Sequence, residues 1–124
     1  MSLELLSSNK VHGGWHKRYS HQSAVNNCTM TFAIYLPPGV EQHNRAPVLY
    51  WLSGLTCTDE NFMHKAAAFK AAADLGLILV APDTSPRGEG VADDENGSYD
   101  FGLGSGFYVN ATEQPFAQHY QMYE

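Results

Sequence analysis

The chain has 124 residues, of which 44% are hydrophobic and 12% aromatic, enough to fold around a core as one small domain or as part of a larger one. Its 13 acidic and 7 basic residues give a formal net charge of −6, which argues against nucleic acid and anionic membranes as partners. The sequence contains no apolar run long enough to span a bilayer, no signal-peptide pattern at its start and too few cysteines for a disulfide framework. We therefore expect a cytoplasmic protein.

The first third of the chain has the pattern of antiparallel strands. Residues 7–23 alternate roughly between apolar and polar side chains, which predicts one or two edge strands. Residues 28–36 predict a stronger strand, with Met30, Phe32 and Ile34 on one face. The Pro-Pro-Gly sequence that follows ends this strand.

Residues 48–76 predict a strand, a sharp loop and a helix. The apolar run at 48–52 breaks at Ser53-Gly54, and a helix should begin near residue 58 or 59. Thr56 and Asp59 have the spacing of a capping box. Apolar residues at helical spacing and two alanine triplets extend the helix to Gly76, a typical C-terminal stop.

The apolar run at residues 77–83 predicts a parallel strand that is buried on both faces. Together with the preceding strand and helix it would form a βαβ unit, and we expect this last parallel strand at the open edge of the sheet. Residues 84–112 are rich in glycine and aromatic residues but have no periodicity, which indicates a long, ordered loop. Residues 115–124 are compatible with the start of a second helix.

The loop after the strand at 48–52 is the candidate functional site. A strand that ends in glycine just before a helix leaves backbone N–H groups free, with the positive end of the helix dipole behind them. In α/β-hydrolases, the loop after the third strand supplies one of the two N–H donors that bind the oxyanion. Leu55 is the candidate donor, and Gly54, Thr56 and Cys57 lie beside it. The alternative is a plain structural turn.

The sequence lacks a complete nucleophile motif. Cys57 is close to a helix N-terminus, where a thiolate is favoured, but no histidine has a spacing that suggests a base for it, so we favour a cysteine without nucleophilic role. A serine nucleophile of an α/β-hydrolase requires Gly-x-Ser-x-Gly. Ser53, Ser98 and Ser105 all lack the flanking glycines.

Cofactor and metal motifs are also incomplete. The glycine-rich residues 102–106 lack the preceding strand and following helix of a dinucleotide site. The acidic residues 93–97 lack the alternating ligands of a calcium loop, and the six histidines are scattered. We therefore predict that the protein uses neither a cofactor nor a metal.

Four motifs, in order along the chain, resemble the S-formylglutathione hydrolases of the esterase D family. They are residues 52–62 (LSGLTCTDENF), 81–88 (APDTSPRG), 104–112 (GSGFYVNAT) and 120–123 (YQMY). The resemblance implies an α/β fold, the three-layer sandwich of an α/β-hydrolase, with residues 1–124 as its N-terminal portion: antiparallel edge strands and the start of the parallel sheet. It also implies a cytoplasmic, commonly homodimeric serine thioesterase that hydrolyses S-formylglutathione to glutathione and formate during formaldehyde detoxification.

For individual residues, the resemblance implies that the loop holding Leu55 contributes to the oxyanion hole and that Cys57 lies beside the active site. The family's catalytic Ser, Asp and His follow the region that matches, so we expect them beyond this chain, on the remaining C-terminal part of the same enzyme. The glycine-rich loop near Asp100, Phe107 and Tyr108 is a candidate wall of the acyl pocket; alternatively it only covers the sheet. Two further interpretations stay open: a carboxylesterase acting on small acyl esters, and a fragment that is inactive alone.

Overall fold

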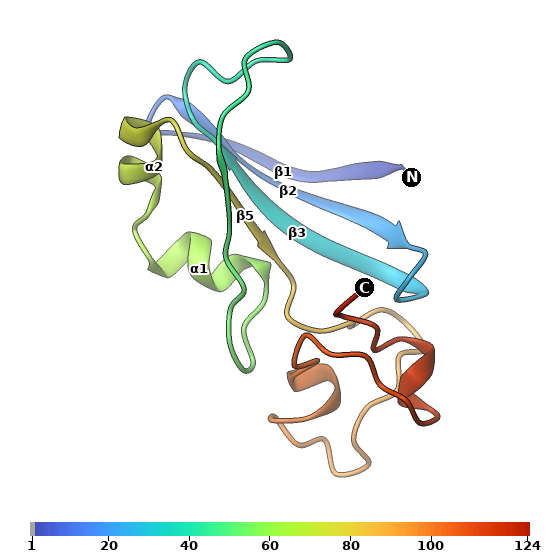
Figure 1. Ribbon diagram of the computed structural model, residues 1–124. Helices are drawn as coiled ribbons and strands as arrows, with labels where there is room; N and C mark the ends of the chain where they lie inside the picture. The colour runs from blue at the N-terminus through green and yellow to red at the C-terminus, as the bar shows by residue number, and fades with distance from the viewer. Residues whose placement is uncertain (1) are drawn as a thin grey trace.

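The computed structural model describes residues 2–124. Within this range, the strands form one five-stranded sheet in the order β1-β2-β3-β5-β4, antiparallel except for the parallel β4–β5 pair (Figure 1). The α-helices connect β4 to β5, and 3₁₀ turns occur only near the C-terminus of this described range. The elements are β1 (Leu3–Val11), β2 (Gly14–Ser23), β3 (Cys28–Leu36), β4 (Val48–Tyr50), α1 (Asp59–Lys65), α2 (Phe69–Leu75), β5 (Ile78–Pro82), η1 (Gly102–Gly104) and η2 (Phe116–Gln118).

The antiparallel strands confirm the expected pattern, and β3 has the predicted bounds. β1 starts earlier than the predicted edge strands, and it joins β2 through His12 and Gly13, whose φ angles are 46° and 76°. Two successive residues with positive φ are typical of the tight hairpin turn whose twist matches that of the strands. β4 is shorter than the predicted strand at 48–52.

The first helix begins at Asp59, but its capping box differs from the predicted one. The N-cap is Thr58, whose hydroxyl accepts a hydrogen bond from the Glu60 N–H at 3.2 Å. The side chain of Asn61 accepts one from the Thr58 N–H at 2.8 Å. The predicted pairing of Thr56 with Asp59 is wrong because Thr56 belongs to the preceding turn, where its φ is 63°.

The expected single helix from residue 58 to Gly76 is two helices, separated at Ala67, which has a φ of 53°. The alanine triplets favour helix locally, but packing against the sheet dictates a bend. In α1, Phe62 stacks on Trp51 with ring centroids 4.4 Å apart. In α2, Phe69 packs against Tyr35 at 5.0 Å, so each segment directs one phenylalanine at a different part of the sheet.

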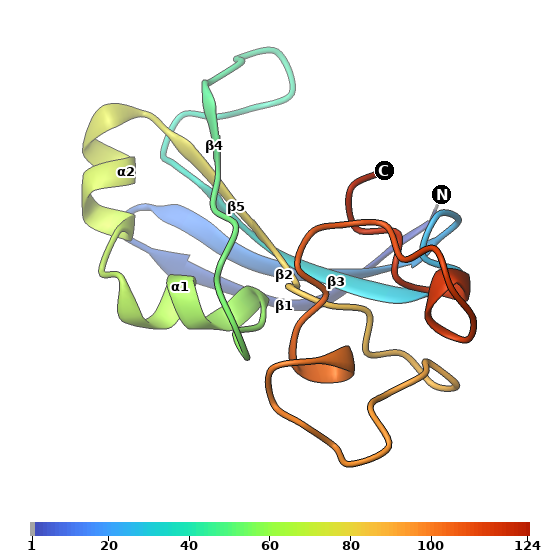
Figure 2. The ribbon, with the colours of Figure 1, turned by 60° about the horizontal axis from the view of Figure 1, so that its bottom comes forward.

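Both helices cover the same face of the sheet (Figures 1 and 2). The core on this face comprises Ala33, Tyr35, Phe62, Met63, Ala72, Leu79 and Ala81. The other face carries Met30, Phe32 and Ile34, which share a face as expected and line an open groove of about 680 Å³. Residues 2–124 thus form two of the three expected layers, and β5 is buried on one face rather than both.

The open edge of the parallel part of the sheet is β4, because β5 inserts between β3 and β4. The prediction that the strand at 77–83 occupies this edge is therefore wrong. All three β4 side chains are exposed, Tyr50 the most, at 67%. β5 is the only strand among residues 2–124 that pairs with β4, so the other edge of β4 is open.

An ion pair anchors the first turn of α1 to the sheet. Asp59 is 1% exposed and accepts a hydrogen bond from Arg18 Nε, on β2, at 2.7 Å. The hydroxyl of Thr31, on β3, donates to the same carboxylate at 3.4 Å. The carboxylate also lies at the positive end of the helix dipole, so three interactions hold the first turn of α1 against the sheet.

The chain after β5 is irregular, as predicted, and it lies beyond the end of β5 (Figure 2). The expected second helix after residue 115 is only the short turn η2. This segment is attached to the β2–β3 turn, where the Asn26 side-chain oxygen accepts a hydrogen bond from the Gln121 N–H at 3.1 Å. His119 Nδ1 also lies 3.0 Å from the Asn26 carbonyl oxygen.

Candidate oxyanion site

The loop after β4 folds into a four-residue turn from Gly54 to Cys57. The Cys57 N–H donates to the Gly54 carbonyl at 3.2 Å and closes the turn. Thr56 is its third residue and has a φ of 63°, a conformation that is a strained outlier for a β-branched residue. The surroundings must therefore hold this turn in place.

Three backbone groups of this loop bond to segments distant in sequence. The Ser53 carbonyl accepts a hydrogen bond from the Tyr108 hydroxyl at 2.7 Å. The Thr56 N–H donates to the Gly104 carbonyl at 3.0 Å. The Cys57 carbonyl accepts from the hydroxyl of Thr84 and from Arg87 Nη2, the latter at 3.2 Å.

The Leu55 N–H remains available. Among residues 2–124, no hydrogen-bond acceptor is found for this amide or for the amide of Gly54. Leu55 borders a cavity of about 210 Å³, which is lined by Ser53, Gly54, Leu55, Thr84, Ser105, Phe107 and Tyr108. A free donor beside a cavity of this size can bind an oxygen atom that carries negative charge.

The predicted neighbours of Leu55 surround the same turn. A Cβ atom built on Gly54 would meet no atom within 4 Å, so the space beside this residue is open. Cys57 has a free, half-buried thiol and borders a second hollow of about 400 Å³, together with Trp51 and Phe62. Thr56 supplies the strained backbone and one of the bonds that fix the turn.

The structure brings two of the three predicted pocket residues to the cavity. Phe107 and Tyr108 line it, both with positive φ, at 55° and 52°. Burial raises the pKa of Tyr108, and the negative charge of Asp83 adds to the shift, so the hydroxyl stays protonated as a donor to Ser53. Asp100 is exposed and does not line this cavity, unlike the other two, so a role for it in the pocket wall stays a prediction.

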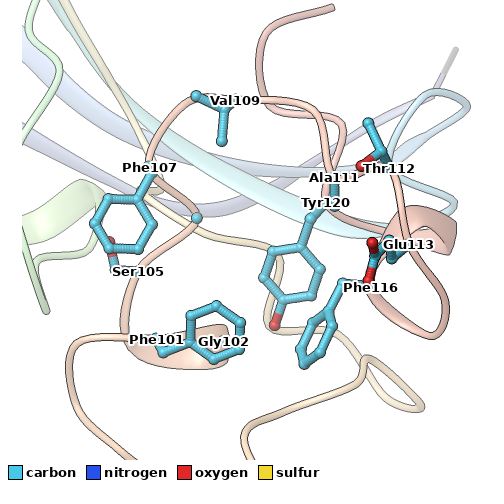
Figure 3. A pocket seen from close by; sticks show the side chains of 11 residues that line it. Phe101, Gly102, Ser105, Phe107, Val109, Ala111, Thr112, Glu113, Phe116 and Tyr120 are labelled. Carbon is cyan, nitrogen blue, oxygen red and sulfur yellow. The ribbon is translucent and has the colours of Figure 1, made fainter.

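A third pocket, aromatic and of about 300 Å³, adjoins the cavity beside Leu55 and shares Ser105 and Phe107 with it (Figure 3). Phe101, Phe116 and Tyr120 form much of its lining. Phe116 lies edge-on to both other rings, at centroid distances of 5.0 and 5.5 Å. Burial raises the pKa of Tyr120 to about 12, so its hydroxyl remains a donor, here to the Ala92 carbonyl at 2.5 Å. The pocket suits an apolar group beside the cavity that Leu55 borders.

Arg87 connects the turn to the long loop. Its Nε donates to the Leu103 carbonyl at 2.8 Å, and its Nη1 pairs with the carboxylate of Asp83. Asp83 is 8% exposed, and burial raises its pKa while the Arg87 charge opposes that shift. Sequence reasoning missed Arg87 and Thr84, because the only sequence signal near them was the family resemblance of residues 81–88. It considered Ser105 as a nucleophile but not as a residue that lines the cavity.

Among residues 2–124, no serine beside the cavity is paired with a histidine. Ser53 and Ser105 line the cavity, but within residues 2–124 no histidine hydrogen-bonds to a serine hydroxyl. Within the same residues, no three or more His, Cys, Asp or Glu side chains lie together in a group that could hold a metal ion. What these residues offer at the cavity is the free N–H of Leu55.

Comparison with known proteins agrees with this architecture, which is that of the N-terminal part of an α/β-hydrolase. The family model described as "Putative esterase" matches residues 23–123, and the chain belongs to this family. An S-formylglutathione hydrolase from Arabidopsis thaliana is 53% identical over 125 residues, which cover 98% of this chain and 42% of the relative.

The solved structure of an S-formylglutathione hydrolase from Agrobacterium tumefaciens superposes with a TM-score of 0.89 at 47% identity, covering 96% of this chain and 42% of that protein. A ferulic acid esterase from Anaeromyces mucronatus, at 22% identity and a TM-score of 0.55, shares the fold over 68% of this chain and 35% of its own. The chain thus spans about 42% of the length of the two hydrolases. No helix among residues 2–124 has the length and apolar character needed to cross a membrane.

Proposed function

We propose that the protein to which these residues belong hydrolyses S-formylglutathione to glutathione and formate, and that this chain supplies the oxyanion-binding loop. The observation that carries the proposal is the Leu55 N–H, which has no acceptor among residues 2–124 and borders a cavity. The identity of 53% and 47% to two proteins named S-formylglutathione hydrolase supports the choice of substrate.

The mechanism follows serine thioesterase chemistry. A serine attacks the formyl carbon while a histidine accepts the serine proton and then passes it to the departing glutathione sulfur. In the tetrahedral intermediate, the oxyanion accepts hydrogen bonds from the Leu55 N–H and from the N–H of the residue after the serine. Water then releases formate from the serine, and neither a cofactor nor a metal takes part.

In this proposal, residues 1–124 are the N-terminal part of a single α/β-hydrolase domain, and the serine, aspartate and histidine lie on the remaining polypeptide of the same enzyme. The open edge of β4 supports this, because a further parallel strand can pair there and place its C-terminal end near Leu55. The proposal extends to a cytoplasmic homodimer that takes part in formaldehyde detoxification.

The decisive experiment removes the Leu55 N–H. Leu55 is the second residue of the Gly54–Cys57 turn, a position where proline is favoured. Leu55→Pro therefore removes the N–H donor with little change to the turn. In the complete protein, we expect kcat on S-formylglutathione to fall by roughly 10²–10³-fold, the effect of losing one oxyanion donor elsewhere. Leu55→Ala, which keeps the N–H, is the matched control and should retain kcat.

A kcat that is equal in Leu55→Pro and Leu55→Ala would refute the role of this amide. The substrate is tested separately, by comparing kcat/KM of the unaltered complete protein on S-formylglutathione and on 4-nitrophenyl acetate. A preference for the nitrophenyl ester by orders of magnitude would refute the thioesterase proposal.

The aromatic pocket favours a second candidate, a carboxylesterase that acts on small acyl esters. Phe101, Phe116 and Tyr120 could hold the apolar group of an ester whose carbonyl oxygen lies at Leu55. The same kcat/KM comparison distinguishes the two substrates, since both use the same oxyanion donor.

We further propose that residues 1–124 are inactive alone, because no serine among the described residues is activated by a histidine. A fluorophosphonate probe, which labels activated serines, should leave the isolated chain unmodified. Stoichiometric labelling of this chain would contradict the proposal.

A further inference from the structure

We infer that Arg87 is a positioning residue for the oxyanion amide: its guanidinium fixes the turn that presents the Leu55 N–H. The inference rests on the proposed function, because it concerns the same turn. The Arg87 side chain does not contact the reacting atoms in this proposal and acts on them only through the backbone of the turn.

The guanidinium joins three segments. Its Nη2 donates to the Cys57 carbonyl at 3.2 Å, and its Nε donates to the Leu103 carbonyl at 2.8 Å. Its Nη1 pairs with Asp83, at the end of β5, which fixes the side chain relative to the sheet. The side chain is 25% exposed and that of Asp83 is 11% exposed, so water competes weakly for these bonds.

These contacts lie directly next to the hydrogen bonds that set the turn. Cys57, whose carbonyl Arg87 holds, closes the turn through its own N–H to Gly54. Leu103, the other carbonyl partner, precedes Gly104, which accepts the Thr56 N–H. Arg87 therefore holds both sides of the junction between the turn and the long loop.

The consequence for Leu55 follows from the geometry that an oxyanion donor requires. Such a donor must stay within about 0.5 Å of its productive position, and a displacement of about 1 Å can lower the rate by roughly 10²-fold. The turn includes a strained Thr56, so its relaxed conformation differs from the one observed. Without Arg87, the turn would lose a restraint close to the Leu55 N–H, which must point at the oxyanion.

The arrangement requires arginine rather than a general positive charge. A guanidinium presents several donors in a rigid plane and can bind two carbonyls and a carboxylate at once, whereas an ammonium is a compact point charge. Arg87→Lys should therefore keep the pair with Asp83 and lose the carbonyl bonds, and Arg87→Gln should lose both.

The experiment uses the complete protein and a matched control. Arg18 is also 25% exposed and pairs with a buried carboxylate, that of Asp59. Unlike Arg87, it bonds among residues 2–124 only to side-chain carboxylates, those of Asp59 and Glu60, and to no backbone carbonyl. Arg18→Gln thus removes a comparable ion pair without touching a carbonyl of the turn. The readouts are kcat and KM for S-formylglutathione, the rate constant of fluorophosphonate labelling, and Tm.

We expect kcat and the labelling rate to fall by roughly ten- to a hundredfold in Arg87→Lys and Arg87→Gln, with KM changed less than about threefold. Arg18→Gln should lower Tm but keep kcat when assayed well below its Tm. Arg87→Lys that folds and keeps the kcat of the unaltered protein would overturn the inference, as would an equal loss of kcat in Arg18→Gln at equal Tm. An unaltered protein without turnover would instead refute the proposed function itself.

Discussion

The sheet and the segment from Asp83 to Glu124 are stabilised by different kinds of interactions. In the sheet, β2 and β3 pair along their whole length, and a continuous apolar core covers one face. In the segment, side chains bond to backbone carbonyls far away in sequence, such as Tyr108 to Ser53 and Arg87 to Leu103. Regular pairing repeats the same contact many times, whereas each bond of the segment is unique.

This difference separates stability from site geometry. A lost contact in the sheet should weaken the whole domain, since the core unfolds cooperatively. A lost contact in the segment should loosen one loop while the sheet stays folded, because loops open locally at lower free energy. The Leu55 turn lies where the two regions meet, so variants in each region should affect it differently.

The largest expected effect is on the sheet side. Asp59→Ala removes a carboxylate that is 1% exposed and leaves Arg18 without its main partner. We expect a loss of about 3 kcal/mol in the free energy of unfolding, the lower end for breaking a buried ion pair, because Arg18 is partly exposed. Urea unfolding of the protein measures it.

The control for this prediction is Lys70→Ala, which breaks the exposed pair between Lys70 and Asp74 on α2. Exposed pairs contribute little, so the urea midpoint should not change measurably. A change below about 1 kcal/mol in Asp59→Ala would show that the pair does not anchor α1.

The next effect belongs to the loop segment. In Gly104→Ala, the new Cβ would collide with the Tyr99 carbonyl, so the loop must move and the bond from Thr56 is disturbed. We expect a loss of about 2 kcal/mol, as for other overpacked sites. Hydrogen exchange should accelerate at residues 54–57 and 101–108 but stay unchanged in β2 and β3.

Gly54→Ala is the matched control, because its Cβ would meet no atom within 4 Å. Its stability should change by less than about 0.5 kcal/mol. Accelerated exchange throughout the sheet in Gly104→Ala would contradict the separation of the two regions.

A smaller effect is expected for Tyr108→Phe. This change removes only the hydroxyl that donates to the Ser53 carbonyl at 2.7 Å. The loss of one partly buried hydrogen bond should lower the free energy of unfolding by about 1 kcal/mol. Thermal unfolding measures this change. Tyr123→Phe, at a residue that is 81% exposed, is the control and should be neutral in the same assay. Equal effects of both variants would exclude a role of this bond in stability.

The smallest expected effect is a dependence on pH on the sheet side. His16 is 7% exposed, packs against Phe69 at 5.1 Å and faces His64 at 6.0 Å. Burial lowers its pKa, as do the charges of His64 and Arg18, while Asp59 and Glu60 oppose the shift. The unfolded chain therefore binds this proton more readily, and stability should fall as the pH drops below the ordinary histidine pKa of about 6.5.

The measurement compares the free energy of unfolding at about pH 7.5 and about pH 5.5, on either side of that pKa. In His16→Gln the decrease on acidification should be smaller than in the unaltered protein. His43→Gln, at an exposed histidine in the β3–β4 connection, should leave the decrease unchanged. An unchanged decrease in His16→Gln would assign the pH dependence to other groups.

Much of the sheet could be predicted from the sequence because its signals are local. β3 is rich in β-branched and aromatic residues and is followed by a Pro-Pro-Gly stop, and both of its predicted bounds are correct. The helix start at Asp59 was also predicted, although the wrong threonine was chosen as its cap. The break at Ala67 was missed, because alanine favours helix locally and only the positions of Phe62 and Phe69 on the sheet require a bend.

The candidate site was predicted only in part. The strand–glycine–helix pattern indicated Leu55, and the structure leaves its amide free, but its oxyanion role remains a prediction. The partners of the turn could not be derived from a pattern. Tyr108 and Gly104 lie about fifty positions further along the chain, and single hydrogen bonds between loops leave no periodic trace in a sequence.

The short strand β4 has a consequence for how the polypeptide behaves at high concentration. The Trp51 N–H and the Pro47 carbonyl both bond to β5, so the backbone groups of Val48 and Tyr50 point to the opposite side. Beside them, Leu52 is 57% exposed. A strand edge with unpaired peptide groups and apolar side chains is a template for self-association. We therefore expect the isolated chain to associate through β4, which a turbidity measurement would detect.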